Sequence, residues 1–421
     1  AEQQRQDQLA QLQADLNQQF NDFAKSPAVR SLIEQLDFDV REQTISLGAL
    51  DRLRDKLGQL NAALLYPLIL DDRIELIITT PNSPPLRRTV ENVDKDQLDQ
   101  AIVALRQALT DPTSDATAPA HQLYQWLIEP IENDLKQANV QTIIYAPDGA
   151  LRYVPLPVLY DGQQWLAQRF RVNNITAASL EELVTQPQST PRILAGAFAD
   201  QTLVYPIPVG TDQVDFRGLP FAGQEVATLG AEVPNTKTLV DRDFSLDAVQ
   251  SLFSQYSILH FATHAAVVPG DASQSFILFG NGEFATLQDI ENWSLNTIDL
   301  VVLSACETGL GGFDNNGEQI LGLGYQFQNR GARAVIASLW SVNDQSTEIL
   351  MTAFYNGLGT GMTKVEALRQ AQIALITNDF SAVGGSRGTI SIISRRTGLP
   401  VSPSLKHPHY WAPFILIGNG L

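Results

Sequence analysis

The sequence predicts an α/β protein in which a mostly parallel sheet is flanked by helices. Apolar, strand-like segments alternate with amphipathic helical ones through the second half of the chain, and this alternation implies parallel strands joined by right-handed crossovers. The segment Leu300–Leu303 is apolar throughout, which suits a strand covered on both faces. The chain has 421 residues, of which 44% are hydrophobic and 18% are charged. This composition supplies enough apolar material for packed cores and excludes a predominantly disordered chain.

The first domain of three, residues 1–60, is predicted to be a helical N-terminal segment. Apolar residues recur every three or four positions around Leu9–Phe23 and again around Leu47–Leu60. Each series forms a one-sided apolar stripe, which is typical of a helix that packs on another layer. The stripes could pack on the domain that follows, or they could end a longer helical repeat array, although no 34-residue repeat is visible.

The second domain, residues 61–190, is predicted to be an α/β unit of its own. Two apolar runs joined at Asp71-Asp72 have the pattern of a β-hairpin. Further elements are expected as helices over 98–109 and 123–135, and as a strand over 140–146 that ends in a Pro-Asp-Gly turn.

The third domain, residues 191–421, alternates strands and helices more regularly. A Ser- and Gly-rich stretch over 378–408 interrupts the pattern and is expected to be a long loop with a short hairpin at 389–394. Strands are predicted at 193–198, 237–240, 257–262, 276–279, 300–305 and 334–339. Helices are predicted at 223–230, 246–254, 318–329, 347–357 and 364–377.

Charge and cysteine content exclude several classes of protein. The chain carries 28 Lys and Arg against 46 Asp and Glu, a net charge of −18. A nucleic-acid binder needs clustered positive charge, so we expect no direct nucleic-acid binding and instead favour basic protein or peptide partners. One cysteine cannot build a disulfide framework or a Cys-rich zinc module.

No run of 18 apolar residues occurs, so no membrane span is predicted. The cytoplasm is the default location, with a trimmed export signal as the alternative.

Two strand ends carry residues that could perform chemistry together. An apolar strand runs into His264, and a second apolar strand runs into Cys306. If the two strands are parallel neighbours, the imidazole and the thiol meet at the carboxyl edge of the sheet, where an imidazole can activate a thiol. The simpler alternative is that Cys306 is a small buried apolar residue.

The motifs around these residues resemble the CHAT domain, a caspase-like family that is often found behind TPR arrays and is related to separases and metacaspases. The blocks HFATHA and VVLSACETGLG carry the resemblance. Further blocks agree with it, namely YAPDGALRYVPLPVL, LPFAGQEVATL, GARAVIASLWSVND and HPHYWAPFILIGN, and all of them occur along the chain in the family's order. The resemblance covers roughly residues 60–421 and implies a caspase-like fold with a non-catalytic companion subdomain over 61–190. It also implies a cysteine endopeptidase with a His264–Cys306 dyad, and we expect a bacterial source.

The resemblance extends to the groups around the dyad. The backbone N–H groups of Cys306 and Ala265 are expected to stabilise the oxyanion, although many caspase-like enzymes have Gly where Ala265 stands. By similarity to separases, Asp344 would face a basic side chain before the scissile bond, with Trp340 as a pocket wall and Glu307 as a further acid. Asp344 is also a good helix cap, which would explain the residue without a substrate.

No cofactor or metal is expected. The motif His260-x-x-x-His264 lacks the glutamate of a zinc protease and lies on a predicted strand, so His260 is expected to be a satisfied core residue. Calcium activation would need a suitable loop, and the spacing of Asp314 and Glu318 fits no EF-hand.

A second function stays open on the sequence. The helical N-terminus and the companion subdomain suit docking, so the chain could be a signalling or scaffold module whose site is silent until a partner, such as a TPR array or a regulatory protein, activates it. A non-catalytic binding relative is the third alternative.

Overall fold

The protein is described by a computed structural model, which covers residues 47–81, 83–175, 190–209, 212–266, 275–304, 318–340, 344–383 and 403–421. Contacts divide the chain into two units, residues 1–53 and 54–421. Helix α3 (Leu47–Gln59) forms where the apolar stripe predicted it, whereas the helix expected over 9–23 lies outside the described residues.

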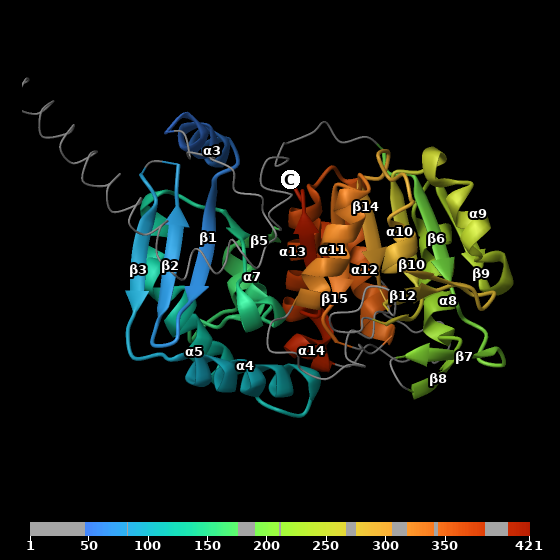
Figure 1. The fold of residues 1–421 in the computed structure, drawn as a ribbon, viewed down its shortest axis with the longest axis horizontal. Coiled ribbons are helices and arrows are strands. Elements are labelled where there is room, and N and C mark those ends of the chain that lie inside the picture. Colours follow the sequence, from blue (N-terminus) through green and yellow to red (C-terminus); the bar gives the residue numbers. More distant parts are fainter. Residues whose placement is uncertain are drawn as a thin grey trace, which may run out of the picture. The chain divides into compact units, whose positions relative to one another are not determined.

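An eleven-stranded sheet forms the centre of unit 54–421, in the order β3-β2-β1-β4-β5-β16-β15-β14-β10-β6-β9 (Figure 1). Pairing is antiparallel in β3-β2-β1 and between β15 and β16, and it is parallel between all other neighbours. The predicted fold class, a mostly parallel sheet flanked by helices, is therefore confirmed. The strands are β1 (Ala62–Ile69), β2 (Ile74–Thr79), β3 (Leu86–Val90), β4 (Thr142–Tyr145), β5 (Arg171–Asn174), β6 (Ile193–Ala197), β9 (Thr236–Val240), β10 (Ile258–Ala262), β14 (Leu300–Leu303), β15 (Ala334–Ser338) and β16 (Phe414–Gly418).

Helices cover the sheet and bury its apolar side chains in two large clusters. Helix α4 starts at a capping box, in which the Asp94 carboxylate accepts from the Gln97 N–H and the Gln97 side chain accepts from the Asp94 N–H. The helices after α3 are α4 (Lys95–Thr110), α5 (Thr117–Leu127), α6 (Glu132–Gln137), α7 (Leu166–Arg169), α8 (Pro220–Glu232), α9 (Leu246–Gln250), α10 (Leu287–Ile290), α11 (Glu318–Asn329), α12 (Asp344–Gly359), α13 (Lys364–Thr377) and α14 (Pro408–Trp411).

Several elements differ from the sequence prediction. The helix expected over 123–135 is divided into α5, a short 3₁₀ turn and α6, because Pro130 cannot continue the hydrogen-bond ladder of α5. The strand expected at 276–279 does not join the main sheet. It forms β12 (Phe276–Leu278), which pairs antiparallel with β11 (Ala265–Ala266) and β13 (Phe284–Thr286).

Some strands were not predicted at all. They include β3, β5, β16 and the separate hairpin β7 (Val204–Val209) and β8 (Asp212–Arg217). In the loop expected over 378–408, the described residues form short 3₁₀ turns at Ser381–Val383 and Pro403–Lys406, and helix α14 begins at its last residue, Pro408. The hairpin expected at 389–394 lies outside the described residues.

The sheet runs continuously through the predicted second and third domains because β5 pairs with β16. The two strands share one backbone pair, Asn174 with Ile417. Buried asparagines add to it: the Asn173 side chain donates to the Gly418 carbonyl at 2.8 Å, and the Asn174 side chain donates to the Leu416 carbonyl at 2.9 Å. Polar residues are expensive to bury unless they are hydrogen-bonded, and here they lock the two strands together.

An ion-pair cluster ties β5 to helix α13. Glu366 at the start of α13 accepts from the guanidinium of Arg171 on β5, and Gln370 donates to its other carboxylate oxygen at 2.7 Å. Burial raises the pKa of Glu366, but the hydrogen bonds from Gln370 and Arg171 outweigh burial and bring the pKa below its ordinary value of 4.5. The charged form of Glu366 is thus favoured by folding.

We predict that Glu366→Gln lowers the free energy of unfolding at pH 7 by about 2 kcal/mol, because it removes the charge from a hydrogen-bonded pair that is largely buried. Since the folded-state pKa is lowered, the carboxylate contributes its full stability above about pH 4.5, and this contribution is lost as the pH falls through the folded-state value. Urea unfolding of parent and variant from pH 7 downward should show the difference narrowing below pH 4.5. The exposed Glu232→Gln is the control, and a difference that grows with acidity would contradict the prediction.

Candidate functional site

Strands β10 and β14 are parallel neighbours, which is the condition under which the residues after the two strands can share one site. Ile258 lies opposite Leu300, and Phe261 lies opposite Leu303. Both strands therefore end at the same edge of the sheet (Figure 1). His264 follows β10 by two residues, and β14 is followed by Ser304. Cys306 and Glu307 lie outside the described residues.

The imidazole of His264 is oriented by a backbone carbonyl. Its Nε2 lies 2.7 Å from the carbonyl oxygen of Arg217, at the end of β8. A carbonyl oxygen can only accept a hydrogen bond, so Nε2 carries the proton and donates it. In the neutral ring Nδ1 is then left with a free lone pair.

Nδ1 of His264 is buried and has no hydrogen-bond partner among the described residues. A buried polar atom without a partner costs about 1–3 kcal/mol and needs an explanation. This nitrogen has the lone pair and the tautomer that a general base requires. The side chain lies at the carboxyl end of β10, where parallel sheets place their chemistry.

Two aromatic rings hold the imidazole from the sides. The rings of Phe198 and Phe216 meet it edge-on, at centroid distances of 6.1 Å and 5.1 Å. The carbonyl of Arg217 is fixed by a close backbone approach one residue later, because a Cβ on Gly218 would stand 2.3 Å from the carbonyl oxygen of Asp200. Sequence reasoning missed these groups, since no local pattern shows that the β7–β8 hairpin reaches the end of β10.

The other predicted site residues lie as follows. Ala265 begins β11, is buried and pairs with Ile277. Trp340 is buried after β15, and its indole N–H donates to the carbonyl of His409 at 3.2 Å, so it forms part of the core wall. Helix α12 begins at Asp344, which places this acid in the first turn rather than at the cap, and its side chain lies outside the described residues.

His260 is a core residue, as expected, but among the described residues only its Nδ1 makes a hydrogen bond, so the expectation of a fully satisfied side chain is not met. Its side chain is completely buried. Nδ1 lies 2.9 Å from the Tyr355 hydroxyl, and Nε2 lies 3.0 Å from the carboxylate of Glu225.

Among the residues that the structure describes, no group of three or more His, Cys, Asp or Glu side chains could hold a metal ion. Across the same ranges, no helix has the length and apolarity needed to cross a membrane.

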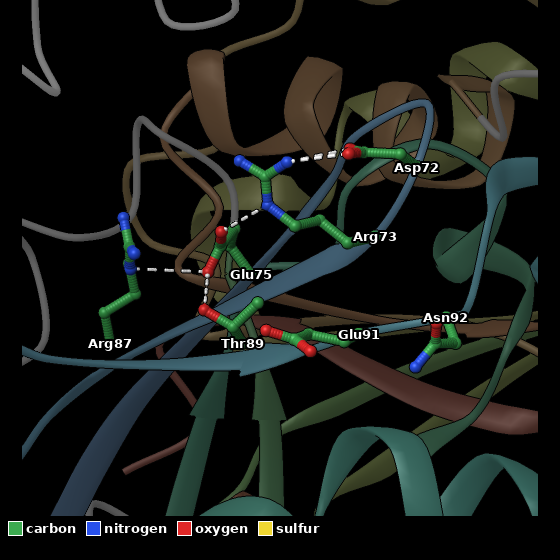
Figure 2. A pocket seen from close by; sticks show the side chains of 7 residues that line it. All are labelled: Asp72, Arg73, Glu75, Arg87, Thr89, Glu91 and Asn92. Carbon is green, nitrogen blue, oxygen red and sulfur yellow. Dashed lines mark hydrogen bonds and ion pairs between the residues drawn. The ribbon is translucent and has the colours of Figure 1, made fainter.

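A polar cavity of about 460 Å³ lies elsewhere, at the β2–β3 end of the sheet (Figure 2). Figure 2 shows Glu75 clamped between Arg73, Arg87 and Thr89, with the Arg73 Nε at 2.7 Å and the Thr89 hydroxyl at 2.8 Å. The lining residues are Asp72, Arg73, Glu75, Arg87, Thr89, Glu91 and Asn92. Because the cationic groups already pair with acids, the cavity offers no evident anion site, and it contains none of the predicted site residues.

Comparisons with known proteins support the family and the fold. The family model described as the CHAT domain matches residues 117–419. Human tetratricopeptide repeat protein 28 is 22% identical over 383 residues, and the match covers 76% of this chain but 14% of that protein.

Two solved structures are similar at low sequence identity. The Saccharomyces cerevisiae separase–securin complex matches with a TM-score of 0.52 and 8% identity, covering 88% of this chain and 31% of the other. The Arg-specific cysteine proteinase gingipain R of Porphyromonas gingivalis has a TM-score of 0.41 and 10% identity, covering 77% of this chain and 74% of the other. The first of these shows a separase-like fold, which confirms the predicted caspase-like architecture.

We predict that Gly218→Ala disturbs the tautomer of His264. The added Cβ forces the backbone at Gly218 away from Asp200 and withdraws the Arg217 carbonyl from Nε2. Nitrogen NMR of ¹⁵N-histidine-labelled protein should show the Nε2–H tautomer for His264 in the parent and a mixed signal in the variant, with the resonance assigned from a His264→Gln spectrum. Gly359→Ala, where a Cβ meets nothing within 4 Å, is the matched control. An unchanged His264 signal in Gly218→Ala would show that the carbonyl does not fix the ring.

Proposed function

The chain belongs to the CHAT domain family, and from this premise we propose that it is a cysteine endopeptidase with a His264–Cys306 dyad. The observation that supports it most is Nδ1 of His264, a buried base of defined tautomer that has no hydrogen-bond partner among the residues the structure describes. Strand β14, which precedes Cys306, runs beside β10 and ends at the same edge. The chain spans 14% of the curated relative that it matches, so the activity is a proposal for this chain and not a property taken from that protein.

The proposed reaction is acyl transfer through a thioester. Nδ1 of His264 takes the proton of Cys306, whose sulfur attacks the scissile carbonyl carbon. The carbonyl oxygen becomes an oxyanion, for which the N–H groups of Cys306 and Ala265 are the proposed donors. Collapse expels the amine, which receives the proton from the imidazolium, and water then hydrolyses the thioester and regenerates the thiol. The Arg217 carbonyl keeps the ring oriented through both proton transfers.

A basic residue before the scissile bond is the proposed specificity. The net charge of −18 favours basic peptide segments, and Asp344 follows β15 in the next position of the sheet beyond β14. A carboxylate there would form a charge-assisted pair with Arg or Lys. Trp340 would serve as a wall of the pocket, and Glu307 is the second candidate acid.

A second candidate function is a partner-activated switch. The likeness to a tetratricopeptide repeat protein supports it, because in a protein of that kind a helical array could open or block the site. Activity of the purified chain alone towards peptide reporters would contradict the switch, and activity that appears only with an added protein partner would favour it.

We predict that Cys306→Ala lowers kcat/KM by at least about 1,000-fold, and that His264→Gln lowers it by about 100- to 10,000-fold, while both proteins stay folded. The assay is cleavage of fluorogenic peptides ending in Arg or Lys. His121→Gln is the matched control, because the described contacts of this α5 imidazole are with the Tyr160 carbonyl and the Tyr124 ring and not with β10 or β14. Full activity in the Cys306→Ala protein would refute the peptidase proposal.

We predict that Asp344→Asn lowers kcat/KM for Arg reporters by about tenfold or more, since an uncharged amide loses the charge-assisted pair. Reporters with a neutral residue at the same position should be unaffected. Glu348→Gln, which changes another acid on α12, is the control, and Glu307→Gln tests the second candidate acid. An equal loss on both kinds of reporter would assign Asp344 to the helix start and not to the pocket.

A further inference from the structure

Four polar side chains meet inside the protein beneath the candidate site. They are Glu225 of α8, His260 of β10, Ser304 at the end of β14 and Tyr355 of α12. The exposed fractions of these residues are 4%, 0%, 1% and 1%. The Ser304 hydroxyl donates to one oxygen of the Glu225 carboxylate at 3.1 Å, and the other oxygen lies 3.0 Å from Nε2 of His260. We call these four residues the Glu225 cluster.

A contribution to stability is a weak explanation for the Glu225 cluster. Burying a carboxylate is expensive, and a buried polar group replaced by apolar side chains of the same shape is often neutral or stabilising. Burial and the charge of Glu225 also raise the pKa of the Tyr355 hydroxyl well above its ordinary value. The contact between Glu225 and His260 is close, but the ring N–H is not well aligned with the oxygen. A buried carboxylate with this desolvation cost needs an explanation, and a role in specificity or positioning is one.

Ser304 and His260 are not a hydrolytic nucleophile and its base. The Ser304 hydroxyl donates to the carboxylate and not to the imidazole. Nδ1 of His260 lies 2.9 Å from the hydroxyl of Tyr355, which places the ring between Tyr355 and Glu225. With every member buried, no substrate reaches the hydroxyl.

The position of Glu225 along the fold is what distinguishes it. One carboxylate oxygen faces β10 four residues before His264, and the other faces the end of β14 two residues before Cys306. Helix α8 also begins three residues after Arg217, whose carbonyl orients the His264 ring. A single side chain thus connects the helix that follows the orienting carbonyl to both strands that lead to the dyad.

We propose that Glu225 is the positioning residue of this site, setting the end of β14 relative to β10 through Ser304 and His260. The inference rests on the proposed function, because it concerns the separation between the thiol of Cys306 and the imidazole of His264. A displacement of about 1 Å between reacting groups costs about 100-fold in rate. A small shift of the end of β14 relative to β10 would therefore lower kcat more than it changes KM.

The test is a graded set of variants assayed for kcat and KM on peptide reporters. Ser304→Ala removes one contact and should lower kcat about tenfold with KM within about twofold. Glu225→Ala removes both contacts and should lower kcat about 100-fold or more. Glu225→Gln keeps an acceptor for the Ser304 hydroxyl and should retain kcat within about threefold. Ser257→Ala, which removes a hydroxyl that binds Arg192 at the opposite end of β10, is the matched control and should match the parent.

The cysteine gives a second readout that needs no substrate. The chain has one cysteine, so alkylation by iodoacetamide at pH 7.5 reports on Cys306 alone. Its rate depends on the thiolate that a nearby imidazole promotes, and it should fall in Ser304→Ala and Glu225→Ala in parallel with kcat. Unfolding in urea is measured on every variant, and Ser304→Ala carries the test if Glu225→Ala does not fold.

The outcomes separate the two proposals. If Ser304→Ala and every folded Glu225 variant keep kcat and alkylation within about twofold of Ser257→Ala, Glu225 is not a positioning residue, while the peptidase proposal stands. If losses of kcat follow only the fraction of unfolded protein, the role is structural and the inference is overturned. If the parent alone cleaves no reporter but alkylation follows the graded series, a peptidase that is active without a partner is contradicted, and the positioning of the thiol is supported.

Discussion

The parallel pairing of β10 with β14 is the constraint on which the rest of the site depends. The register from Ile258–Leu300 to Phe261–Leu303 brings two strand ends to one edge, and both strands are buried on both faces. Side chains along a strand alternate between faces, so a shift of one residue would turn every side chain of one strand to the opposite face. The contacts of Ser304 and His260 with Glu225 exist only in the observed register.

The protein uses different kinds of polar contact for different tasks. At the joint between β5 and β16, asparagine amides fasten two strands that share little backbone pairing, and the Arg171–Glu366 pair ties β5 to helix α13. At the candidate site, the partner of His264 is an uncharged carbonyl. A carbonyl fixes the tautomer and the orientation of the ring as a carboxylate would, but it places no full negative charge beside the ring.

The family match and the sheet have different limits. The CHAT domain model begins at residue 117, where α5 starts, whereas the sheet continues through β1, β2 and β3, which precede that point in the chain. Strand β1 pairs with β4 inside the matched region. The strands outside the family model therefore extend the same sheet, and the polar cavity at β2 and β3 lies on that extension.

The sequence by itself determined the fold class, the hairpin at Asp71-Asp72, the strands at 193–197, 258–262 and 300–303, and the position of His264 just beyond a strand end. These features follow from local periodicity and from short apolar runs that have a clear β pattern. Strands β5 and β16 were not predicted. The Asn-Asn pair in β5 is typical of a loop, and the apolar run of five residues in β16 does not show which strand it pairs with. Only the tertiary structure decided that the Arg217 carbonyl binds His264 and that Glu225 reaches both β10 and β14, since these contacts join residues 47 and 79 positions apart. Such contacts depend on how helices and hairpins pack over the sheet, and no pattern along the chain encodes that distance.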